Sequence, residues 1–138
     1  MITATRKLEF DYGRRVLRHE SKCKHLHGHR GVIEVTVSAP DLDSIGRVID
    51  FGQIKSILGK WVDDNWDHQV LLHADDPQLL HLTNTEPKPP YVMKSGNPTA
   101  ENMAREFFEV AKTLLQPPLK IESVRMWETP NCYAEYSE

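Results

Sequence analysis

Four of the seven histidines in this 138-residue chain fall within eleven positions, and a cysteine lies among them. His27 and His29 flank Gly28, so in an extended segment both imidazoles project to the same side of the chain. The glycine between them lets the backbone approach whatever they hold. Two neutral imidazoles on one side supply half of a tetrahedral zinc site. An isolated His-Gly-His sequence is equally compatible with a polar turn that binds nothing.

Cys23 is the second candidate for chemistry, since it lies between Lys22 and Lys24 and close to the histidines. Neighbouring cations favour the thiolate form, in which a cysteine acts as a base or nucleophile near neutral pH. Most single cysteines are instead small buried hydrophobic residues, but a Lys-Cys-Lys sequence is poorly suited to a core. We therefore predict a catalytic Cys23, and we predict that Cys132 packs within the last strand.

Local patterns predict the elements that must hold these residues. Alternating or β-branched segments indicate four strands, over residues 3–12, 32–37, 121–127 and 132–136. Helical spacing of apolar residues indicates one helix over 53–65 with Asp50 as its cap. A second helix is expected to begin at Asn97-Pro98 and to run to about residue 115. Prolines interrupt residues 67–97, which we interpret as an extended connection that carries short pieces of structure.

The order of these elements is β-β-α-α-β-β. It favours an α+β fold, with an antiparallel sheet and both helices on one face. The edges of such a sheet need partners, so we expect a homo-oligomer that forms by sheet extension. The chain length fits one domain over residues 1–138.

Composition argues against several classes of protein. The net charge is only -3 and the cations are scattered, so we expect no binding to nucleic acid. No apolar run reaches the roughly 20 residues that span a bilayer, so we expect no membrane segment. The N-terminus lacks the apolar region of a secretory signal. We therefore expect a cytoplasmic protein with both of its cysteines reduced.

The segment from Cys23 to His29 resembles the Cys-x3-His-Gly-His motif of the 6-pyruvoyl/6-carboxy-tetrahydropterin synthase family. Further motifs of that family follow in order, namely Val48-Ile49-Asp50-Phe51, Trp66-Asp67-His68, Pro98-Thr99-Ala100-Glu101-Asn102 and Trp127-Glu128-Thr129. The resemblance covers nearly the whole chain. It implies a T-fold subunit that assembles into a trimer or hexamer, with active sites between subunits. The three-residue spacer between Cys23 and His27 favours the bacterial 6-carboxy branch of the family.

By this resemblance the substrate is a pterin, 7,8-dihydroneopterin triphosphate. The implied products are 6-carboxy-5,6,7,8-tetrahydropterin, acetaldehyde and triphosphate, in a lyase step of queuosine biosynthesis. Formation of 6-pyruvoyl-tetrahydropterin is the alternative within the family. The implied cofactor is Zn²⁺, with His27 and His29 among its ligands.

The resemblance also implies roles for other residues. Cys23 would remove a proton from the substrate, and the Asp67–His68 pair would return one. Glu128 would anchor the guanidine-like edge of the pterin. Further contacts to the substrate are implied for Thr99 and Glu101. Without the resemblance, the carboxylate at 128 is an ordinary strand-end residue and the Asp-His pair an ordinary turn.

The chain departs from the family where the first zinc ligand is expected, because Arg14 stands in place of a histidine. A guanidinium is always protonated and has no lone pair for a metal. Three outcomes remain open: His19 acts as a substitute ligand, the other two histidines hold zinc weakly, or the chain binds pterin without turnover. Gly31 stands where the family tends to have an aromatic residue, and we expect looser packing there.

Overall fold

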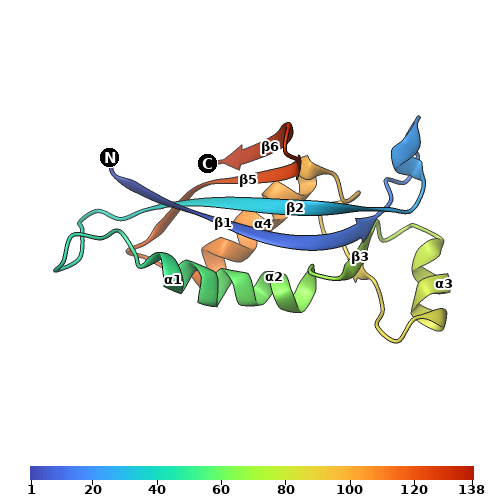
Figure 1. Ribbon diagram of the computed structural model, residues 1–138, viewed down its shortest axis with the longest axis horizontal. Helices are drawn as coiled ribbons and strands as arrows, with labels where there is room; N and C mark the ends of the chain where they lie inside the picture. Colours follow the sequence, from blue (N-terminus) through green and yellow to red (C-terminus); the bar gives the residue numbers. More distant parts are fainter.

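The computed structural model describes residues 1–138 (Figure 1). Its strands are β1 (Thr3–Arg14), β2 (His27–Ser38), β3 (Gln69–Leu72), β4 (Tyr91–Val92), β5 (Lys120–Thr129) and β6 (Cys132–Ser137). They form one sheet in the order β4-β3-β1-β2-β5-β6. The four predicted strands are present, and the first two are longer than predicted. They pair continuously from Thr3 opposite Ser38 to Arg14 opposite His27, so the His-Gly-His segment lies beside the end of β1.

The helices are α1 (Phe51–Ile54), α2 (Lys60–Asn65), α3 (Gln78–Thr85) and α4 (Ala100–Leu114). A π-helical turn, η2 (Lys55–Gly59), joins α1 to α2, so the three form the first predicted helix; a 3-10 turn, η1, spans Lys22–Lys24. Asp50 caps this helix as predicted, because its carboxylate accepts a hydrogen bond from the Gly52 amide at 2.7 Å. This helix and α4 lie on the same face of the sheet (Figure 1).

The start of α4 differs from the prediction by two residues. Its cap is Thr99 rather than Asn97, and the Thr99 hydroxyl accepts a hydrogen bond from the Asn102 amide at 3.1 Å. The Asn97 side chain instead bonds both the amide and the carbonyl of Leu17, at 2.8 and 3.0 Å. Asn97 therefore ties the loop that follows β1 to the beginning of α4.

Residues 67–97 form a connection that carries short elements, as predicted, and these elements are β3, α3 and β4. β3 pairs with β1 in parallel, and β4 pairs with β3 in parallel, so the sheet is mixed rather than wholly antiparallel. Strands of four and two residues are too short for periodicity to reveal. β3 forms because the end of β1 supplies its partner, and β3 in turn supplies the partner of β4.

Packing around Gly31 is tight, and the looser packing expected there is not found. An added Cβ atom would lie 2.9 Å from side-chain atoms of Phe10, Tyr12 and Met126. Gly31 belongs to the buried face of β2, which the helices cover. The aromatic rings of β1 therefore fill the space that a side chain at position 31 would need. No helix is both long enough and apolar enough to cross a membrane.

Candidate active site

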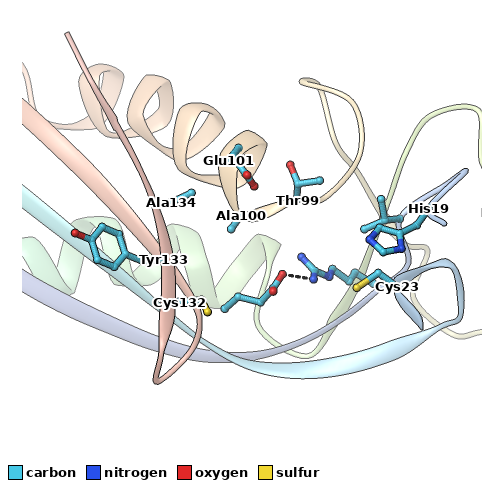
Figure 2. Close-up of a pocket in the computed structure, with 11 residues that line it drawn as sticks. His19, Cys23, Thr99, Ala100, Glu101, Cys132, Tyr133 and Ala134 are labelled. Carbon is cyan, nitrogen blue, oxygen red and sulfur yellow. Dashed lines mark hydrogen bonds and ion pairs between the residues drawn. The ribbon is translucent and has the colours of Figure 1, made fainter. Parts of the chain in front are cut away.

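A cavity of about 340 Å³ lies among the end of β1, the loop that follows it, the first turn of α4 and the β5–β6 hairpin (Figure 2). Four residues with predicted roles line it together: Cys23, Thr99, Glu101 and Glu128. They are separated by up to 105 positions in the chain, and only the fold brings them to one place. A cavity of this size suits a small organic ligand.

The residues from α4 offer polar groups at one wall of this cavity (Figure 2). The Thr99 hydroxyl uses a lone pair for the helix cap, so its O–H remains free to donate to a ligand. Glu101 lies in the first turn of α4, where the helix dipole favours a carboxylate. This wall can therefore both donate to and accept from a polar substrate.

Sequence reasoning missed several residues of the cavity wall, namely Val16, Ala100, Cys132, Tyr133 and Ala134. The prediction that Cys132 packs within its strand is wrong, because this thiol is exposed and lines the cavity. Cys132 pairs with Thr129 across the turn between β5 and β6, next to Glu128. The Pro130-Asn131 turn was the signal in the sequence that could have placed it there.

Arg14 lies at the centre of the site, with only 2% of its side chain exposed. Its Nη2 donates to the Glu128 carboxylate, the ion pair marked by the dashed line in Figure 2. Its Nη1 donates to the Pro98 carbonyl at 2.8 Å. Its Nε lies 3.4 Å from His27 Nε2. The guanidinium thus contacts both the predicted pterin anchor and a predicted zinc ligand.

The two imidazoles of the His-Gly-His segment project to the same side, as predicted, with ring centroids 4.8 Å apart. His27 Nδ1 lies 2.7 Å from the His25 carbonyl, which assigns its proton to Nδ1 and leaves a lone pair on Nε2. His29 Nε2 is buried and has no hydrogen-bond partner. Burial, and then the charge of Arg14, lower the pKa of His29, which favours the neutral ring.

Known proteins resemble this chain along nearly its whole length. The family model for 6-pyruvoyl tetrahydropterin synthase matches residues 3–138. The chain belongs to this family. It is 42% identical over 140 residues to the 6-carboxy-5,6,7,8-tetrahydropterin synthase of Rickettsia conorii, covering 98% of this chain and 99% of that protein. It is 33% identical over 151 residues to the enzyme of that name from Haemophilus influenzae, over the full length of both.

Solved structures share the fold of this tetrahydropterin synthase family member. An uncharacterized protein of Wolinella succinogenes matches with a TM-score of 0.84 at 24% identity, covering 99% of this chain and 97% of the other. The 6-pyruvoyl tetrahydropterin synthase of Caenorhabditis elegans matches with a TM-score of 0.70 at 22% identity, covering 99% and 95%. The predicted α+β T-fold is confirmed.

Tetrahydropterin synthases typically use zinc, but the residues at this position do not fit a resident zinc ion. His27 and His29 are suitable donors, whereas Arg14 brings a fixed positive charge and no lone pair. Its Nε also faces the His27 lone pair that a metal would need. His19 lines the cavity, and its Nδ1 accepts a hydrogen bond from the Ser21 amide at 2.9 Å. The structure does not group it with the other two histidines as a three-ligand set.

The Asp67–His68 pair is formed, but neither residue lines the cavity. His68 Nδ1 lies 2.9 Å from the Asp67 carboxylate, and 77% of the His68 side chain is exposed. Hydrogen bonding to Asp67 raises the pKa of His68. The backbone of Asp11 holds both residues, donating to Asp67 at 2.9 Å and accepting from His68 at 2.7 Å. His68 has a φ of 57°, an uncommon left-handed conformation for a residue with a side chain.

Proposed function

We propose that this chain is a 6-carboxy-5,6,7,8-tetrahydropterin synthase, a lyase that converts 7,8-dihydroneopterin triphosphate with loss of acetaldehyde and triphosphate. Relatives named for this activity are 42% and 41% identical over nearly the whole chain. The observation that carries the proposal is that Cys23, Thr99, Glu101 and Glu128 all line the same cavity. We place this one-domain protein in the cytoplasm, in the pathway to queuosine.

Two walls of the cavity bind the substrate, one formed by the β5–β6 hairpin and the other by the start of α4. Glu128 accepts hydrogen bonds from the guanidine-like edge of the pterin, whose adjacent donors suit a bidentate carboxylate. Thr99 donates its free O–H to the substrate, and Glu101 accepts from a side-chain hydroxyl of the substrate. These contacts hold the substrate side chain next to Cys23.

Cys23 is the proposed base, which removes a proton from the substrate side chain as triphosphate leaves. An acid must then return a proton, and His68 has the raised pKa for this role. Because His68 is exposed and lies outside the cavity, we propose that it serves the cavity of a neighbouring copy. The protein is then a trimer or hexamer whose sites lie between subunits. The β4 and β6 strands are the sheet edges available for such pairing.

Mixed oligomers test this arrangement. Cys23→Ser and His68→Ala are each expected to abolish turnover, whereas an oligomer that contains both variants regains part of it, because some sites combine intact residues from different chains. Native mass spectrometry verifies that mixed oligomers form. Mixed oligomers without any recovered turnover would place the base and the acid in the same chain.

Product analysis tests the activity itself. The protein is incubated with 7,8-dihydroneopterin triphosphate, and the products are identified by mass spectrometry. We expect 6-carboxy-5,6,7,8-tetrahydropterin and acetaldehyde. Formation of 6-pyruvoyl-tetrahydropterin instead would assign the chain to the other branch of the family.

A second candidate function is pterin binding with little or no turnover. Arg14 favours it, because this residue occupies the position of a zinc ligand and pairs with Glu128. Any zinc would depend on His27 and His29 alone, and two ligands rarely hold zinc tightly. Bound pterin without product in the incubation above would identify this function.

A further inference from the structure

The Arg14 guanidinium is held from three directions. It contacts the Glu128 carboxylate, the Pro98 carbonyl and His27 Nε2. Its side chain is 2% exposed, so almost no water reaches it. Arginine does not lose its proton at ordinary pH, and the cation is therefore permanent.

A guanidinium offers a carboxylate the same pattern as a pterin ring, namely adjacent coplanar N–H donors. Glu128 is 28% exposed and forms part of the cavity wall, so it is the group that a ligand in the cavity can reach. We propose that Arg14 is an internal mimic of the pterin edge, which occupies Glu128 until a pterin displaces it. The proposal rests on the proposed role of Glu128 as the pterin anchor.

The same side chain keeps zinc out of the site. Arg14 Nε faces the lone pair of His27, and its charge opposes a dication beside His29. One residue therefore competes with both the metal and the ligand. Two substitutions separate these effects. Arg14→Met removes the guanidinium without adding a metal ligand, whereas Arg14→His removes the guanidinium and also adds a metal ligand.

Binding of neopterin, followed by isothermal titration calorimetry, tests the mimicry. We expect Arg14→Met to bind neopterin about 10- to 100-fold more tightly than wild type, the worth of one charge-assisted hydrogen bond. Adding Glu128→Gln to Arg14→Met should abolish the gain. Arg47→Met is the matched control, since Arg47 pairs with Asp43 and does not line the cavity. Neopterin affinity that is unchanged or weaker in Arg14→Met, or raised equally in Arg47→Met, overturns the proposal.

A small guanidinium ion provides a second test that does not depend on one substitution. In Arg14→Ala, methylguanidinium at non-denaturing concentration should weaken neopterin binding, because it enters the space left by the side chain. Urea has a similar planar shape but no charge, and it should have no such effect. Equal effects of the two compounds would contradict the mimicry. Circular dichroism spectra establish that each variant is folded.

Zinc content after dialysis, measured by elemental analysis, tests the exclusion of the metal. Wild type and Arg14→Met should retain little zinc, and Arg14→His should retain it at least about tenfold more tightly. One tightly held zinc per chain in the wild-type protein would contradict the proposal that Arg14 excludes the metal. Turnover by that protein would still support the proposed synthase activity. Conversely, tight neopterin binding by Arg14→Met supports the mimicry even if no form of the protein yields product.

Discussion

Glu128→Gln is expected to destabilise the protein more than Arg14→Met, although the two side chains form one ion pair. The reason is the difference in their exposure, because the Arg14 side chain is 2% exposed and that of Glu128 is 28% exposed. Without its carboxylate partner, the buried guanidinium keeps only the Pro98 carbonyl and the distant His27 nitrogen. Without its guanidinium partner, the carboxylate can turn to water in the cavity.

The magnitudes follow from these environments. Removing one partner of a buried charge pair costs about 3–5 kcal/mol, and the partial exposure of Glu128 reduces this to about 2–3 kcal/mol for Glu128→Gln. The cost of Arg14→Met is about 1 kcal/mol, as for other ion pairs whose remaining partner is solvated. The double variant should be more stable than Glu128→Gln alone, since it leaves no unpaired charge. In a domain of this size each kcal/mol lowers the melting temperature by about 3–5 °C.

Urea denaturation followed by circular dichroism, at one fixed protein concentration, measures all four proteins. The coupling free energy comes from the double-mutant cycle. If Arg14→Met is the more destabilising single substitution, or if the two effects simply add, then the guanidinium does not depend on Glu128 as inferred.

Other regions of the molecule support further predictions. Gly31→Ala should destabilise the protein by about 1–3 kcal/mol in the same urea experiment, because the added methyl meets three side chains at 2.9 Å; an unchanged midpoint would contradict the packing described. Arg15→Met should cost about 2–4 kcal/mol and hasten proteolysis of the following loop, since it leaves the fully buried Asp76 carboxylate unpaired; wild-type resistance to protease would refute this. NMR titration should give His68 a pKa above 6.5, and this pKa should be lower in the Asp67→Asn variant, which lacks the carboxylate partner. The stability that this pair adds is complete below pH 6.5 and is lost as the pH rises through the raised pKa, so a His68 pKa that does not respond to Asp67→Asn would exclude the coupling.

Several features of this protein follow from its sequence alone. The β-branched run in β2, the helical spacing after Asp50 and the proline that precedes α4 are local signals, and the corresponding elements are present. The alternation of strand side chains also required His27 and His29 to project together, which the structure confirms. The order of the motifs was sufficient to identify the family, because the motifs of that family follow one another in register along nearly the whole chain.

Other features depended on contacts between distant segments. β3 and β4 are too short to carry a periodic signal. They are stabilised mainly by pairing, β3 with the end of β1 and β4 with β3. Cys132 has the sequence neighbours of a packed residue, yet the β5–β6 register brings it to the cavity.

For Arg14, the sequence determines the chemistry of the side chain and the tertiary structure determines its partners. Its residue type alone shows that it cannot bind a metal, because a guanidinium has no lone pair. Which groups it would contact could not be read from the chain, since Glu128 is 114 positions away and Pro98 is 84 positions away. Burial of a permanent charge requires partners. Only the tertiary structure, in which β2 alone separates β1 from β5 and the start of α4 lies close to the end of β1, determines that these partners include the carboxylate proposed to hold the pterin.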